Sequence, residues 1–220
     1  MKMMILFFIT FVTVLANAYV VPTYRDLKPA TQAMLERQDF GIPVAATAAN
    51  LKSAFAGNTS SAAVTNSTFL AQPDVARNIV ITPGGTTADV ASCTIVVNGT
   101  NIFGRAISEN FVFANDASAA TTGSKAFKTL TSVVFPLNCE DGGFAATWSI
   151  GVGEKIGLKN CMANAGDWFH SMVAGVKEGT AATIVNSASA VESNTADFNG
   201  TMNGSSRFIG YFVQNFACQP

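Results

Sequence analysis

The chain contains one histidine, so any histidine-dependent chemistry must use it. Ser–His–Asp and Cys–His systems both need an imidazole beside the nucleophile. His170 lies in WFHSMV (168–173), a run rich in the apolar and aromatic residues typical of a strand. A structural or surface role is therefore the preferred interpretation of His170. A single histidine also gives little support for the common zinc sites.

Two other short motifs suggest binding or catalysis on first inspection. Glu140-Asp141 is an acidic pair, but neighbouring strand residues point to opposite faces, so a turn is the better interpretation. GVGEKIG (151–157) has its third glycine one place off the G-x-G-x-x-G spacing, and no βαβ unit surrounds it. We therefore predict a protein that is not an enzyme, with no catalytic, cofactor-binding or metal-binding residues and no cofactor.

The four cysteines are candidates for disulfide bonds. They are Cys93, Cys139, Cys161 and Cys218. Because no C-x-x-C is present, a zinc or iron–sulfur site has no support. Three disulfide pairings are possible, and an exported protein would use some of them. Buried free thiols and a bond between subunits through Cys218 are the other two interpretations.

The composition is poor in charge. Only 12% of the residues are charged, against about 25% in an average domain. A surface with so few charges indicates that partners cover much of it. The formal net charge of −1 offers no bulk attraction to nucleic acid, so direct nucleic-acid binding is not expected.

Residues 1–21 form an apolar leader. Lys2 precedes an apolar run from Ile5 to Leu15, and Ala16-Asn17-Ala18 matches a signal-peptidase cleavage pattern. The run is shorter than the about 20 residues of a membrane span. Two interpretations remain: a signal removed after Ala18, or an apolar arm retained for assembly.

Residues 22–72 are predicted to be a partly helical arm followed by a polar linker. Asp26 can cap a helix that has Pro29 in its first turn and ends at Gly41. A second short helical stretch is expected over 45–55. The small polar residues of 57–68 are typical of a linker. The main domain is therefore expected over 73–220.

The pattern of the main domain is that of strands. Strand-like runs recur every 12–20 residues, with Gly, Asn and Asp between them. They cover 77–82, 92–99, 105–114, 126–136, 145–153, 168–176, 182–188 and 206–216. Asn98-Gly99 is a hairpin signal. The sequence therefore predicts an all-β fold, a β-sandwich or jelly-roll domain with an N-terminal arm.

Residues 73–216 resemble a family of tailed-bacteriophage virion structural proteins of the head-decoration or minor-capsid type. The resemblance lies in the order and spacing of several segments rather than in one diagnostic motif. They are ARNIVIT, GGTTADVA, TIVVNGTNIFGRAISENFVF, KAFKTLTSVVFP, WSIGVGEKIGLKN and the closing GVKEGTAATIVNSASAVESNTADFNGTMNGSS. The A-x-A leader and the four cysteines depart from the family pattern.

The resemblance implies assembly into a particle and no catalysis. The expected function is that of a capsid decoration or cement protein on the phage head. Its expected partners are the major capsid protein and further copies of itself, in a homo-oligomer, with no membrane in the assembled particle. The alternatives are a tail or neck protein, and an exported cell-surface β-sandwich for adhesion or carbohydrate binding.

Overall fold

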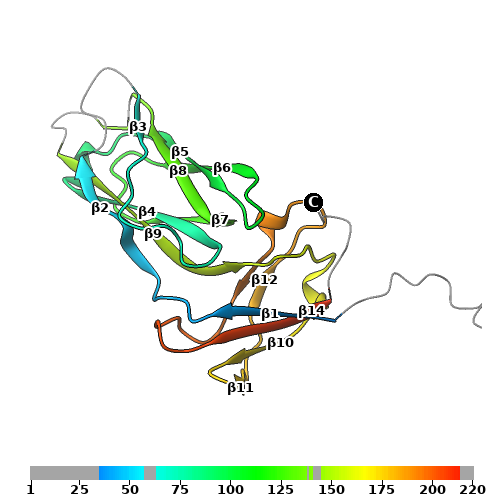
Figure 1. The fold of residues 1–220 in the computed structure, drawn as a ribbon. Helices are drawn as coiled ribbons and strands as arrows, with labels where there is room; N and C mark the ends of the chain where they lie inside the picture. Colours follow the sequence, from blue (N-terminus) through cyan, green and yellow to red (C-terminus); the bar gives the residue numbers. More distant parts are fainter. Residues whose placement is uncertain (1–34, 57–62, 138, 141–144, 214–220) are drawn as a thin grey trace, which may run out of the picture. The chain divides into compact units, whose positions relative to one another are not determined.

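A computed structural model describes residues 35–56, 63–137, 139–140 and 145–213. The chain divides into two units, 1–33 and 34–220, and every described residue lies in the second. The described residues form three antiparallel sheets, here called A, B and C, so the predicted all-β sandwich is confirmed (Figure 1). The helical elements among them are three 3-10 turns, η1 (Thr87–Asp89), η2 (Ala165–Asp167) and η3 (Val191–Ser193).

Sheets B and C enclose the larger core. Sheet B has the order β12 (Thr183–Val185), β13 (Thr195–Asp197), β9 (Ala146–Gly157), β4 (Arg77–Gly85) and β7 (Thr121–Phe127), and β2 (Thr47–Ala56) also pairs with β9. Sheet C has the order β3 (Val64–Asn66), β8 (Thr129–Phe135), β5 (Cys93–Thr100) and β6 (Ala106–Phe113). Trp148 of sheet B packs its ring 5.0 Å from Phe113 and 5.5 Å from Phe135 of sheet C. These aromatic contacts join the two layers of the sandwich.

Sheet A covers a second core. Its order is β1 (Leu35–Gly41), β14 (Phe208–Val213), β10 (Trp168–Val173) and β11 (Val176–Lys177). Trp168, Phe198, Phe208 and Phe212 pack together beneath this sheet. Ile156, near the end of β9, is buried in the same cluster, whereas the first part of β9 lies in the larger core.

Most of the predicted strands are present with shifted ends. The run 126–136 is the end of β7 followed by β8, and 168–176 is β10 followed by β11. The first run was expected to end at residue 82, but Gly84 and Gly85 still pair with β9, and the chain turns afterwards at η1.

The hairpin signalled by Asn98-Gly99 is present, but its turn begins at residue 101. Asn98 and Gly99 lie within β5 and pair with β6, and the turn that joins these strands spans 101–105. The side-chain oxygen of Asn101 accepts hydrogen bonds from the backbone N–H groups of Phe103 and Arg105, which fixes the reversal there. Asn98 instead donates to Ser132 of the neighbouring β8.

Both helix predictions are wrong for the described residues. The helix expected to end at Gly41 is replaced by strand β1 over 35–41, and the helical stretch expected over 45–55 lies largely in β2. Backbone pairing with β14 and β9 overrides the weak helix preference of these Ala- and Gln-containing runs. The leader 1–21, the rest of the expected helix up to residue 34 and residues 57–62 of the linker lie outside the described residues.

No helix in the described ranges has the length and apolarity required to cross a membrane.

Candidate functional site

Strand β4 lies between two bulged neighbours. On one side, Arg77 pairs with Ile156 and Ile79 pairs with Val152. The one β4 residue between them, Asn78, therefore faces three residues of β9, 153–155. On the other side, Asn78 pairs with residue 126 of β7 and Val80 pairs with residue 122. Here Ile79 is the one β4 residue that faces three, 123–125. Bulges bend the backbone and often shape a site at a sheet surface.

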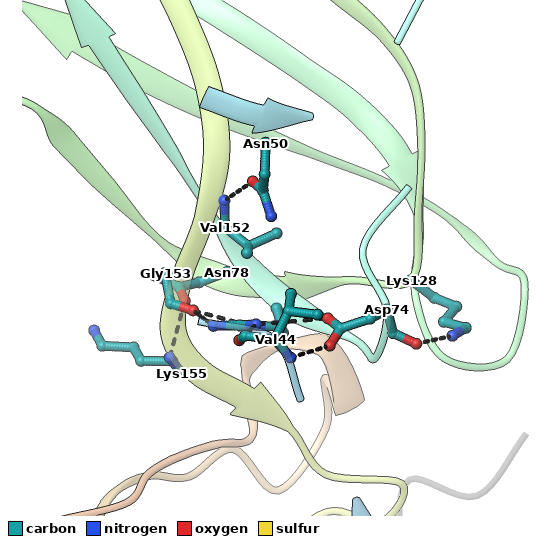
Figure 2. Close-up of polar contacts among 9 residues, drawn as sticks. Val44, Asn50, Asp74, Asn78, Lys128, Val152, Gly153 and Lys155 are labelled. Carbon is teal, nitrogen blue, oxygen red and sulfur yellow. Dashed lines mark hydrogen bonds and ion pairs between the residues drawn. The ribbon is translucent and has the colours of Figure 1, made fainter. Parts of the chain in front are cut away.

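Asn78 holds both bulges in place. Its side chain is completely buried, and its Oδ1 accepts a hydrogen bond of 3.0 Å from the Lys155 amide (Figure 2). Its Nδ2 donates to the Gly123 carbonyl at 3.1 Å. A Cβ added at Gly153 would lie 2.5 Å from the Asn78 amide, so glycine is needed where the two strands approach.

Arg77 fixes the same region with a buried charge. Its Nε and Nη2 both donate to the Gly153 carbonyl, and Nη1 donates to the Val44 carbonyl at 2.7 Å. The Asp74 carboxylate lies 3.5 Å from Nη1 and also accepts from the Val44 amide. Burial lowers the pKa of the Arg77 guanidinium, and the Asp74 charge opposes this. The Arg77 contacts tie the segment before β2 to β9.

An open groove of about 370 Å³ lies over these bulges. Because Ile79 and Ile81 point into the core, the alternating residues Asn78, Val80 and Thr82 must face the opposite side of sheet B. That side of β4 forms part of the lining, together with residues from the neighbouring strands. These residues include Ala46, Thr47, Ala48, Ala120, Thr122, Glu154, Lys155 and Asp197.

The polar groups of the groove include one buried hydroxyl and three charged side chains. The Thr82 hydroxyl oxygen is inaccessible to solvent and makes no hydrogen bond. The side chains of Glu154, Lys155 and Asp197 are half-buried, and no described residue lies within ion-pair distance of them. The Glu154 charge nevertheless interacts with the Arg77 guanidinium, and Asp197 pairs in register with Lys155. The groove therefore offers carboxylate and ammonium groups to a small polar molecule.

The sequence motifs considered for chemistry lie in three different places. His170 is on β10, where its ring stacks on Tyr211 with 4.6 Å between the centroids. Glu140 is buried and accepts a hydrogen bond of 3.4 Å from the Trp148 indole, whereas Asp141 lies outside the described residues. GVGEKIG forms the end of β9, and its middle residues 153–155 are the bulge beside the groove.

The structure pairs two of the candidate disulfide cysteines with each other. Cys93 and Cys139 form a disulfide, and their Cα atoms are 5.0 Å apart. Cys161 is also disulfide-bonded, so none of the three described cysteines is a free thiol. Cys218 lies outside the described residues.

The face of sheet A that points away from its core carries several apolar and aromatic side chains. Phe208 and Phe212 of β14 point into the core, so the alternating residues of β14 lie on the opposite face. The strand register places residues of β1 and β10 beside them. We call the following residues the outer patch: Leu35, Phe169, His170, Met172, Ile209, Tyr211 and Val213. Leu35 is 60% exposed and Phe169 62%. Ile209 is buried, and the same register also places Arg37, Asp39 and Lys177 on this face.

Neither the groove nor the outer patch was found from the sequence alone. Arg77 and Asn78 open the run RNIVIT, and polar residues at the start of a predicted strand are the signal that could have marked them. Within the described ranges, no three His, Cys, Asp or Glu side chains gather as they would around a metal ion.

Comparisons of the chain with protein-family models, curated proteins and solved structures found no match.

Proposed function

We propose that the protein is a structural component of a bacteriophage virion, and specifically a capsid decoration or cement subunit on the head surface. The outer patch of sheet A carries this proposal, because large apolar side chains exposed on one face, here Leu35 and Phe169, are typical of protein–protein contact sites. The resemblance of residues 73–216 to virion structural proteins supplies the class of particle. The low charge content adds support, because a neutral surface can be covered without desolvating many charges.

The partners in this proposal are the major capsid protein and further copies of the chain. Burial of apolar area gains about 25 cal/mol per Å², so the outer patch can stabilise a repeated contact on a capsid lattice. Two half-buried rings, those of His170 and Tyr211, lie stacked within the patch. Aromatic side chains are enriched at the centres of interfaces. Arg37 and Asp39, which pair with Tyr211 and Ile209, supply a polar border.

Mass spectrometry of purified particles tests the assignment. A decoration subunit should be present in hundreds of copies per particle, whereas a tail or neck component should be present in tens or fewer. Absence of the chain from purified particles would overturn the virion proposal.

Substitution of the outer patch tests the contact surface. Phe169→Asp should prevent the purified chain from binding to particles that lack it, because a carboxylate would be buried against the lattice. Val112→Asp is the matched control, since Val112 is 68% exposed but lies on β6 of sheet C. Equal binding by the two variants would show that sheet A does not form the contact.

A second candidate is an exported cell-surface protein for adhesion or carbohydrate binding, and the Cys93–Cys139 disulfide favours it. Disulfides form and persist in oxidising compartments. A particle assembled in a reducing cytoplasm would acquire this bond only after release from the cell. A mature N-terminus at Tyr19 would support the exported protein, and an intact Met1 in the particle would exclude it.

A further inference from the structure

We propose that the outer patch of sheet A docks onto a different protein, whose surface carries an apolar depression bordered by carboxylates, and that this face does not join two copies of the chain. The proposal rests on the proposed virion function and identifies which of its two partners meets the patch. It follows from the charges on this face, from the pairing of its one carboxylate and from its exposed apolar side chains.

The outer face of sheet A carries a surplus of positive charge. The strand register places Arg37 and Asp39 of β1 and Lys177 of β11 on this face. Arg207, immediately before β14, joins them, because its guanidinium binds the Asp39 carboxylate. Glu36, the other acidic residue of these strands, lies on the side that faces the core. Three cations and one carboxylate therefore share one face of a chain whose formal net charge is −1.

The Asp39 carboxylate is already paired within the chain. Its Oδ1 accepts a hydrogen bond of 3.0 Å from Nε of Arg207. Its Oδ2 lies 2.9 Å from Nη2 of Arg207 and 3.5 Å from Nη2 of Arg37. The carboxylates beside the strands, those of Asp167 and Glu178, each accept a backbone hydrogen bond. Among the described residues, this face thus presents no unpaired carboxylate to a partner.

A two-fold contact between copies is therefore unfavourable at this face. In such a contact the same patch of both chains meets, so the groups of one copy face the same groups of the other. Arg37, Lys177 and Arg207 would approach a second set of the same three cations, and like charges brought together disfavour a complex. Further copies of the chain are expected to meet through other surfaces.

The apolar part of the patch requires a complementary depression. The register shift between Trp168 and His170 turns the intervening Phe169 outward, and this residue is 62% exposed. Leu35 is similarly exposed at the start of β1. Aromatic anchors fill pockets near the centre of an interface, and a polar rim surrounds them. A partner with an apolar pocket for Phe169 and carboxylates around that pocket would complement the anchor and the cations together.

The test is binding of the full oxidised chain to purified particles that lack it. The wild type should bind more weakly as NaCl rises from about 50 to about 500 mM, because salt screens charges at the edge of a contact. Lys177→Glu should weaken binding at least about fivefold at the lower salt concentration, because it replaces attraction to a carboxylate with repulsion.

The matched control is Arg105→Glu, which changes the net charge by the same amount. Arg105 is an exposed cation in the turn between β5 and β6 of sheet C, so this variant should bind as the wild type does. Both substituted side chains are exposed, so both variants should fold. The salt dependence of the wild type needs no variant, and an affinity that salt leaves unchanged would overturn the acidic partner.

The remaining outcomes separate this proposal from the virion function. If the wild type binds no particle at any salt concentration, the virion function fails and the docking proposal fails with it. If the wild type binds and Lys177→Glu binds as tightly as Arg105→Glu, the acidic partner alone is overturned. Analytical ultracentrifugation of the free chain tests self-association. A dimer that Phe169→Asp dissociates would show that the patch joins two copies, and would overturn the proposal.

Discussion

Removal of the Cys93–Cys139 disulfide should lower the free energy of unfolding substantially. The bond connects the start of β5 to the segment after β8, and both cysteines are buried in the larger core. The two cysteines are 46 positions apart, and a loop of this length gives a chain-entropy effect of about 4 kcal/mol. The Cys93→Ala/Cys139→Ala double variant should therefore have a melting temperature lower by about 8–16 °C.

The assay is urea unfolding of the wild type, the two single variants and the double variant. Either single substitution breaks the same bond, so each single variant should lose nearly as much stability as the double variant. Such strong non-additivity identifies a shared interaction. Variants are preferable to a reducing agent here, because reduction would also open the disulfide at Cys161.

Two results would refute this reasoning. One is a double variant whose free energy of unfolding equals that of the wild type, which would mean that the bond does not constrain the unfolded chain. The other is a pair of single variants whose losses sum to that of the double variant. In that case the loss would come from the packing of each side chain rather than from the cross-link.

Three further predictions concern the scaffold around the two candidate surfaces. Asn78→Ala should lower the free energy of unfolding in urea by about 2–4 kcal/mol, because it leaves a buried backbone amide and a buried carbonyl unpaired. Asn110→Ala, at an exposed position, should change this free energy little, and equal losses in the two variants would contradict the bridging role of Asn78. Gly151→Ala should lower the free energy of unfolding by about 3 kcal/mol, because its Cβ would lie 1.7 Å from a backbone oxygen of β2. An unchanged urea midpoint would contradict this close approach. A side-chain hydrogen bond from Arg207 lowers the pKa of the Asp39 carboxyl below its ordinary value of 3.8. The stability that the ionised carboxylate contributes is therefore present above pH 3.8 and is lost as the pH falls through the lowered pKa. The difference in urea midpoint between wild type and Asp39→Asn should therefore be present at about pH 7 and vanish at about pH 2.

The strands of the sandwich could be predicted because their side chains alternate locally. In β5, Cys93, Ile95 and Val97 are buried, and the residues between them are more exposed, so the period of two is visible in the sequence itself. The strands near the N-terminus could not be found in this way. Of the seven residues of β1 only Gln38 and Phe40 are buried, and its partner β14 lies at the other end of the chain.

The candidate groove depends on register, which a single sequence does not encode visibly. Asn78 is important because it faces three residues of β9, and no local pattern in RNIVIT indicates which residues lie opposite. The outer patch cannot be predicted from the sequence for a related reason. The sequence shows that WFHSMV alternates poorly, but the Trp168/His170 register shift places both Phe169 and His170 on the exposed side.

The glycines of GVGEKIG are explained by packing. An added Cβ would lie 1.7 Å from the Thr47 carbonyl oxygen at Gly151, and 2.5 Å from the Asn78 side chain at Gly153. At Gly157 it would lie 2.5 Å from the Ala126 side chain. Glycine is thus needed along β9 because neighbouring chains approach its backbone closely. The same strand contributes to both cores and to the groove, so a substitution at these glycines would disturb the cores and the groove together.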